Sequence, residues 1–433
     1  MTMNIILGGG IAGLSAAYEA KRLGFETVIF ESSPTPGGLL NNFTVDGFRF
    51  DSAVHLSFAE EREVREVFDR SDYHRHEPEA VNWDTEQWLR HPVQNNLYPL
   101  QASEKVELIS GLVNAPPSGD IRNYEDWLIQ QYGEPIARRW PMVYTEKYWT
   151  LPANQLGTDW VGARVRRADL REVLQGAFSE DTPHGFYAKE MRYPKQGGYR
   201  SFIKPMIDEA RVIANHEVVR IDVNNRHVYF ANGEVTSFDR LISTLPLPEL
   251  IALMDDVPDD IRQTAASLFA TSVDLISVGF SKPNVSPTLW FYIYDRSILA
   301  ARGYSPNWKS PDAAPEGCSS IQFEIYSSPA RPLTHSIEDL KANTRDGIKK
   351  MGLADDADIL FLHHKRLKYG NVVFDLGMEA RRDRVKDYVE SCGIALAGRF
   401  GEWAYLWSNQ SMMSGINAAR KIFSPAPPAS VAP

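Results

Sequence analysis

Three glycines near the start of the chain have the spacing of a dinucleotide-binding turn. Gly8, Gly10 and Gly13 lie in the run GGGIAG, between the apolar segment 4–7 and the helical pattern LSAAYEAKRLG. Gly8 permits a tight turn, Gly10 lets the backbone approach a pyrophosphate, and Gly13 lets the helix pack on the strand. Phosphates would lie at the helix N-terminus, where unpaired N–H groups favour negative charge. A second apolar run, TVIF, ends at Glu31, whose carboxylate would bind a ribose.

A second stretch with unusual chemistry lies near the C-terminus. Residues 398–410 read GRFGEWAYLWSNQ and combine one arginine, four aromatic side chains and two amides. A core strand would use aliphatic residues, and a solvated loop would avoid Trp403 and Trp407. The stretch is therefore expected to contact a flat and charged group.

The composition predicts a soluble protein of more than one domain. The chain has 433 residues, of which 43% are hydrophobic and 24% are charged. The net charge of −10 opposes binding to a nucleic-acid polymer or to acidic lipid. Cys318 and Cys392 cannot build a disulfide framework or a cysteine-rich metal site, so no metal is expected. The chain shows no signal peptide and no apolar run of about 20 residues, which predicts a cytoplasmic protein without a membrane span.

The segments that must position these residues alternate between helical and strand-like patterns. Helical periodicity runs through 60–72, 103–139 and 165–178. Strand-like alternation runs through 216–235, 271–295 and 318–327. We therefore expect an α/β protein that also contains antiparallel strands.

The residues after Glu31 favour FAD over NAD. Residues 32–43, SSPTPGGLLNNF, resemble the second glycine motif of the large flavoprotein family that includes amine oxidases and protoporphyrinogen oxidase. The resemblance implies a resident FAD that contacts Gly37 and Gly38. Gly398 and Arg399 would then lie against its pyrophosphate, where a guanidinium suits phosphate geometry.

The resemblance also implies a discontinuous Rossmann-like FAD domain. We expect this domain to comprise residues 1–87, 190–247 and 385–424. A helical insertion would occupy 102–189, and an antiparallel-sheet substrate domain would occupy 88–101 and 248–384. Residues 425–433 are expected to be a disordered tail because their sequence is of low complexity.

Three further segments narrow the resemblance. They are WLRHPVQNNLYPL at 88–100, YTEKYWTLPANQLGTDWVGARV at 144–165 and RYPKQGGYRSF at 192–202. In this order, and with residues 398–410, the chain resembles the UDP-galactopyranose mutase family, most closely its eukaryotic-type branch. In that family N5 of the reduced flavin attacks the anomeric carbon of a nucleotide sugar, and the ring recloses through another hydroxyl. The resemblance implies a nucleotide-diphosphate sugar substrate, a reduced FAD, NAD(P)H as a candidate transient reductant, and a homo-oligomer as one candidate assembly.

The same resemblance assigns roles to individual residues. His55 would lie beside the central ring of the flavin, and Gln94 would read the edge of the nucleotide base. The residues expected to be catalytic are His55, Arg164, Tyr292, Tyr405 and Asn409. The substrate is expected to contact Gln94, Trp149, Arg164, Tyr292, Asn371 and Tyr405. The cofactor is expected to contact Gly8, Gly10, Gly13, Glu31, Gly37, Gly38, Val219, Gly398, Arg399 and Gln410.

Some positions depart from the family pattern. Asn371 stands where the family carries a tyrosine on the diphosphate, and the second diphosphate arginine could be replaced by Arg296 or Arg302. His91 and Val93 stand where the family has an aromatic pair around the base. A nucleotide or sugar other than UDP-galactose is the preferred explanation.

Two alternatives to a mutase remain open at this point. One is an oxidase, dehydrogenase or desaturase of the amine oxidase and protoporphyrinogen oxidase superfamily, which would share the FAD domain but exchange electrons with its substrate. The other is a member that binds FAD without catalysis. Arg164, Tyr292 and Tyr405 favour the mutase, because an oxidase of apolar amines has little use for a cationic slot lined by hydroxyls.

Overall fold

The first of the two seven-stranded sheets in the described residues is built around the N-terminal glycine turn. The computed structural model describes residues 3–116, 119–162, 169–182 and 190–423. The parallel strands of this sheet are β1 (Met3–Leu7), β2 (Thr27–Phe30), β9 (Val212–Ile213), β12 (Val235–Ser243) and β18 (Ile394–Leu396). Strands β10 (Val218–Asp222) and β11 (His227–Phe230) extend it in antiparallel fashion from β12. The near-continuous apolar runs of β1, β2 and β18 are typical of parallel strands with both faces covered.

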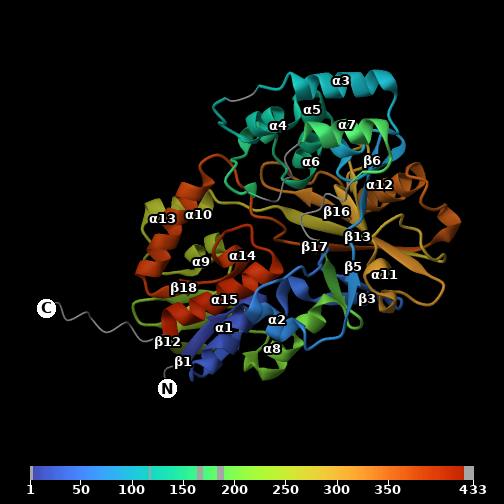
Figure 1. Cartoon of the computed structure of the whole chain (residues 1–433). Helices are drawn as coiled ribbons and strands as arrows, with labels where there is room; N and C mark the ends of the chain where they lie inside the picture. Colours follow the sequence, from blue (N-terminus) through green and yellow to red (C-terminus); the bar gives the residue numbers. More distant parts are fainter. Residues whose placement is uncertain (1–2, 117–118, 163–168, 183–189, 424–433) are drawn as a thin grey trace.

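Both ends of the chain cover this sheet together. Helices α1 (Ile11–Arg22) and α15 (Ser408–Phe423) pack side by side, in blue and red at the lower left of Figure 1. Gly415 permits the close crossing, since a Cβ there would lie 2.1 Å from the Ala12 carbonyl oxygen. The remaining helices around this sheet are α2 (Arg62–Phe68), α8 (Lys204–Glu209), α9 (Leu247–Leu253), α10 (Asp259–Ala266), α13 (Met378–Ser391) and α14 (Gly398–Gly401).

The second sheet is mostly antiparallel. Its order is β17 (Ile359–Leu367), β13 (Ser272–Phe280), β16 (Ser319–Ser327), β15 (Arg302–Tyr304), β14 (Trp290–Ile293), β6 (Ala80–Asp84) and β7 (Gln87–Arg90). Only β14 and β6 run parallel within it. The flanking elements are α11 (Pro306–Lys309), α12 (Ile337–Lys350), the hairpin of β3 (Asn42–Val45) and β4 (Phe48–Asp51), and the pair β5 (Tyr73–His76) and β8 (Met191–Pro194).

A group of helices forms the insertion at the top of Figure 1. It comprises α3 (Ala102–Val113), α4 (Tyr124–Tyr132), α5 (Glu134–Arg139), α6 (Pro141–Tyr148) and α7 (Leu170–Phe178). Side-chain caps begin two of them, because Asn123 accepts from the Asp126 amide and Asp169 accepts from the Glu172 amide. Helix α6 is tied to the second sheet by Lys147, whose Nζ lies 2.7–3.1 Å from four carbonyl oxygens of residues 293–300.

The expected fold class is confirmed, whereas several expected domain boundaries lie elsewhere. Residues 80–87 belong to the second sheet, because β6 pairs with β14 instead of closing the first domain. Residues 248–266 and 378–384 lie with the first sheet, because α9, α10 and α13 bury their apolar faces against one another and against β10 and β18. The expected tail, 425–433, lies outside the described residues.

Candidate functional site

A cavity of about 420 Å³ lies where the glycine turn of the first sheet meets the second sheet. Parts of residues 37–40, 54–58 and 398–411 line it, together with the glycine turn and β14 and β15. Among the residues predicted from the sequence, it brings together Gly8, Gly10, Glu31, Gly37, Gly38, His55, Tyr292, Gly398, Arg399 and Tyr405. One concave site therefore joins residues from both ends and the middle of the chain.

The glycine turn is shaped to receive a group that needs close backbone approach. A Cβ on Gly13 would lie 2.0 Å from the Gly8 carbonyl oxygen, so Gly13 is required for packing of α1 against the turn. A Cβ on Gly10 would meet nothing nearer than the Gly38 Cα at 4.0 Å. Gly10 and Gly38 both line the cavity, so the open space faces a ligand position at the start of α1.

These two glycines give a prediction that separates folding from cofactor binding. Gly13→Ala should destabilise the fold by about 1–3 kcal/mol, because the methyl group overlaps the turn. Gly10→Ala should leave the fold intact but reduce flavin content, because its methyl group occupies the ligand position. Thermal denaturation and the flavin-to-protein absorbance ratio measure the two effects. Normal flavin content in Gly10→Ala would contradict the placement of the cofactor.

Glu31 holds the glycine turn as well as facing the cavity. Its Oε2 accepts from the Gly9 amide at 2.7 Å, and its Oε1 accepts from the Ser33 amide at 2.8 Å. The carboxylate is buried and lines the cavity at the end of β2. Oε1 also accepts from the Ser32 hydroxyl at 3.3 Å. Oε2 keeps a second acceptor position, so the predicted contact with a ribose remains chemically available there.

The aromatic stretch divides its side chains between cavity and core. Tyr405 and Trp407 line the cavity, as the sequence led us to expect for the whole stretch. Trp403 is fully buried instead and packs near Tyr369 and Phe400, which corrects that expectation. Its positive φ of 52° reverses the chain between α14 and the cavity-lining residues.

Arg399 is a half-buried cation held in place by an amide. Its Nη2 donates to Asn371 Oδ1 at 2.6 Å, and its guanidinium lies 4.8 Å from the centre of the Tyr405 ring. Its buried Nε has no hydrogen-bond partner among the described residues, and Arg399 makes no ion pair with a described carboxylate. The group therefore fits an anion such as a phosphate.

Arg302 is a second cation at the other wall of the cavity. It lies opposite Tyr292 in the β14–β15 ladder, and its Nε donates to Glu324 at 2.5 Å. Its guanidinium also covers the ring of Tyr148, 5.3 Å from the centre. Arg296, which the sequence could not separate from Arg302, is exposed and pairs with Glu146. Of these two candidates, the structure brings only Arg302 to the cavity wall.

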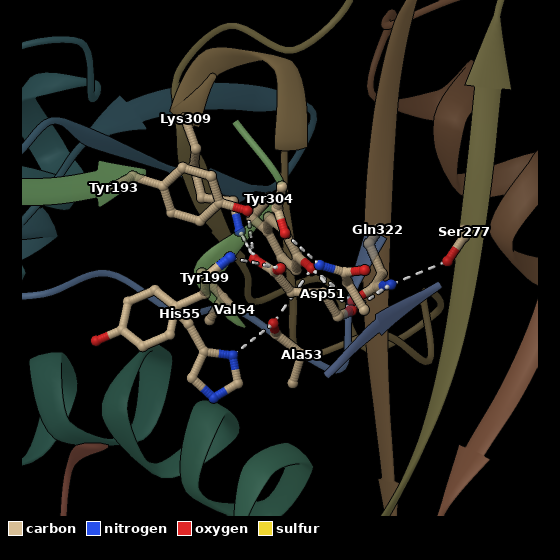
Figure 2. Close-up of polar contacts among 12 residues, drawn as sticks. Asp51, Ala53, Val54, His55, Tyr193, Tyr199, Ser277, Tyr304, Lys309 and Gln322 are labelled. Atoms are coloured by element: carbon tan, nitrogen blue, oxygen red, sulfur yellow. Dashed lines mark hydrogen bonds and ion pairs between the residues drawn. The ribbon is translucent and has the colours of Figure 1, made fainter. Parts of the chain in front are cut away.

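His55 is fixed by a buried polar network behind the cavity (Figure 2). Its Nδ1 lies 3.1 Å from the Ala53 carbonyl oxygen, so Nδ1 carries the proton and Nε2 is the acceptor. Ala53 has a φ of 78°, an uncommon conformation for a residue with a Cβ. The hydroxyl of Tyr304 lies 3.3 Å from the same carbonyl and 2.7 Å from Gln322 Oε1.

An ion pair anchors this network two residues before Ala53. Lys309 Nζ and the Tyr193 hydroxyl donate to Asp51 Oδ2 at 2.6 and 2.7 Å. Both members of the pair are 0% exposed. Burial opposes ionisation of Asp51, but the charge and hydrogen bond of Lys309 outweigh it and hold the pKa of Asp51 below its usual value. The paired carboxylate thus fixes the start of the strained segment that carries His55.

The pKa of His55 gives a pH prediction. Burial lowers it from the ordinary 6.5 to about 4, although Asp51 opposes the shift. His55 should therefore stay neutral between about pH 5 and 8, which NMR of its ring can measure. The unfolded chain binds this proton as the pH falls below 6.5, whereas the folded chain binds it only near pH 4. The free energy of unfolding should therefore decrease as the pH falls from 6.5 to about 4. A His55 titration near pH 6.5 would contradict the buried environment.

Among the other predicted residues, those that the structure describes do not line the cavity. Trp149 packs 5.2 Å from the Tyr405 ring, and Asn371 contacts Arg399, so both support residues that line it. Asn409 donates to Glu61, and Gln94 lies in the short 3-10 helix Val93–Asn95. Gln410 accepts from the Trp407 amide, and Val219 is 47% exposed on β10. Arg164 lies outside the described residues.

Sequence reasoning did not select the residues behind His55. Asp51, Tyr304, Lys309 and Gln322 come from four separate places in the chain and meet only in the fold. Asp51 lies within the same run as His55, FRFDSAVH, which was the one local signal available. A buried lysine in a short helix such as α11 carries no sequence signal of its own.

The fold and the cavity agree with the class of protein that the family match defines. The sequence matches the family described as flavin containing amine oxidoreductase over residues 11–423, and the chain belongs to that family. It is therefore a flavin-dependent enzyme with a Rossmann-type domain, and the family implies FAD. The glycine cradle, Glu31 and Arg399 are the residues that would hold it.

Comparison with individual proteins separates fold from activity. A structure of reduced UDP-galactopyranose mutase superimposes with a TM-score of 0.90 at 25% identity, over 98% of this chain and 95% of that chain. Putrescine oxidase with bound putrescine superimposes with a TM-score of 0.68 at 16% identity, over 98% and 100%, which shows the fold alone. The 1-hydroxycarotenoid 3,4-desaturase of Flavobacterium sp. (strain P99-3) is 43% identical over 56 residues, which are 13% of this chain and 12% of the desaturase. The match thus spans only about an eighth of that relative.

Two other kinds of site are absent from the described residues. No helix in this part of the chain is long and apolar enough to cross a membrane. Over the same residues, no group of three or more histidine, cysteine or acidic side chains could hold a metal ion.

Proposed function

We propose that the protein is a flavin-dependent mutase that interconverts the pyranose and furanose forms of a nucleotide-diphosphate sugar. The observation that carries the proposal is the cationic part of the cavity wall. Two guanidinium groups lie there over two tyrosine rings, Arg302 over Tyr148 and Arg399 over Tyr405. The likeness to reduced UDP-galactopyranose mutase supports the same reading.

The residues of this wall suit a dianionic leaving group. Arg399 would bind the pyrophosphate of FAD. Arg302 would attract the substrate diphosphate, and the hydroxyls of Tyr292 and Tyr405 would donate to its oxygens. We propose Arg164 as a further cation for the same group. Reduced FAD, when bound, would supply the nucleophile through N5, and a transient NAD(P)H would supply the electrons.

The neighbouring residues would position and shield the reacting groups. His55 is neutral and fixed in one tautomer, so it can accept a hydrogen bond without adding charge beside the flavin. The aromatic side chains Phe58 and Trp407 pack edge to face at 4.6 Å on the cavity wall, which would exclude water from the reacting carbon.

An oxidase or desaturase is the second candidate. The family name and the short match to a carotenoid desaturase favour it. The half-buried Arg302 weighs against it, because an apolar amine or polyene has no anionic group that this cation could bind.

A substrate panel distinguishes the two candidates. The chemically reduced protein is incubated without oxygen with UDP-, GDP- and TDP-sugars, and the anomeric signals of the sugars are followed by NMR. Conversion of a pyranose into a furanose form supports the mutase. No conversion of any donor, together with flavin reduction by an amine or a polyene, would establish the oxidoreductase instead.

A further inference from the structure

A tyrosine of the helical insertion reaches the centre of the cationic wall. Tyr148 is the last residue of α6, and it lines the cavity. Its hydroxyl lies 3.2 Å from Asn371 Oδ1 and 3.2 Å from the hydroxyl of Tyr405. The same Asn371 oxygen accepts from Arg399 at 2.6 Å. One amide oxygen therefore joins the insertion to the cation beside the flavin cradle.

This arrangement places the phenol of Tyr148 beside Asn371, a position that has no phenol of its own. The sequence indicated that Asn371 stands in place of a tyrosine that would contact the diphosphate. The short amide leaves space for a larger side chain from elsewhere, and the Tyr148 hydroxyl ends at that amide. We propose that Tyr148 binds the substrate diphosphate through its hydroxyl and supplies the donor that Asn371 cannot. This inference rests on the function proposed above.

The hydrogen bonds allow the Tyr148 proton to turn towards an anion. Without a ligand, the hydroxyl can donate to Asn371 Oδ1. When that proton moves to a phosphate oxygen, Asn371 Oδ1 keeps the hydrogen bond from Arg399, so no buried acceptor loses its last partner. The donation then becomes charge-assisted, which makes it stronger than the bond it replaces.

The surroundings of Tyr148 hold its ring in one orientation. The ring stacks on Tyr144 at 5.3 Å and meets the edge of Tyr326 at 4.8 Å. Arg302 covers its face at 5.3 Å, so a positive charge lies beside the position that the anion would take. Because the side chain is only 7% exposed, little conformational freedom remains to be lost on binding.

The test uses Tyr148→Phe in the FAD-bound protein, with UDP, GDP, TDP and UMP as ligands in calorimetric titrations. Tyr144→Phe is the matched control. Tyr144 lies one helical turn before Tyr148 and does not line the cavity, so this variant removes a hydroxyl outside the proposed site. We expect Tyr148→Phe to lower the affinity for the nucleoside diphosphate that the wild-type protein binds most tightly by roughly tenfold to a hundredfold. The flavin content should not change. Tyr144→Phe should change this affinity by less than about twofold. If UDP is the ligand bound most tightly, Tyr148→Phe should lower the affinity for UDP by a larger factor than the affinity for UMP.

The outcomes separate this inference from the proposed function. If the wild-type protein binds a diphosphate and Tyr148→Phe binds it equally well, the role of Tyr148 is wrong and the proposed function stands. If the wild-type protein binds none of the three diphosphates, both are wrong. A loss in Tyr148→Phe that exceeds the loss in Tyr144→Phe supports both.

Discussion

Replacing Lys309 with methionine is expected to lower the free energy of unfolding by about 3–5 kcal/mol. Lys309 and Asp51 are both 0% exposed, so the substitution leaves a carboxylate buried without its counter-ion. The Lys309 ammonium also lies 4.4 Å and 4.5 Å from the centres of the Tyr193 and Tyr304 rings, and these contacts are lost as well. Denaturant unfolding of the FAD-bound protein measures the change.

An exposed ion pair provides the matched control. Lys204 and Asp208 lie 2.5 Å apart within α8 and are 62% and 55% exposed. Lys204→Met should change the free energy of unfolding by less than about 1 kcal/mol, because solvent screens the pair. If Lys204→Met and Lys309→Met both change the free energy of unfolding by a similar small amount, the proposal that a buried network holds the His55 segment is wrong.

Replacing Arg302 with glutamine is expected to weaken nucleoside diphosphate binding by about 1.5–3 kcal/mol. The substitution removes a cation of the cavity wall that lies opposite Tyr292 in the β ladder. It also leaves the buried Glu324 without its counter-ion, which destabilises the fold. The double variant Arg302→Gln/Glu324→Gln removes both charges and should keep the flavin, so calorimetric titration of this variant isolates the binding effect.

Arg296→Gln is the control for charge alone. Arg296 is 63% exposed and pairs with Glu146 outside the cavity wall. Its loss should change diphosphate affinity by less than about twofold, although both variants remove one arginine from the same segment. Wild-type affinity in the double Arg302 variant, or a large loss in Arg296→Gln, would contradict the assignment of the diphosphate cation.

The FAD domain could be predicted from the sequence because its signals are local. Gly8, Gly10 and Gly13 lie within one turn, and Glu31 ends the next strand, so spacing alone indicates how they meet. The fold class is confirmed, and family membership supports FAD. The roles assigned to individual residues stay predictions, although many of those residues line one cavity.

Other features depend on contacts that spacing does not encode. Arg302 could not be separated from Arg296, because only the pairing of β14 with β15 brings Arg302 opposite Tyr292. Tyr148 lies far from Asn371 in the chain, and their contact forms only because α6 meets the segment between β17 and α13. The boundary expected at residue 87 lies within the second sheet because β6 pairs with a strand about 200 residues later.

The most direct measurement follows flavin redox state and sugar isomers in the same sealed sample. The protein is tested in oxidised and in chemically reduced form, with the nucleotide sugar in large excess, while visible absorbance reports the flavin. We expect the reduced protein to convert many equivalents of sugar while its flavin stays reduced, and the oxidised protein to convert none. Turnover that consumes the reducing equivalents, or oxidised flavin that is bleached by its substrate, would contradict a mutase and establish a redox enzyme.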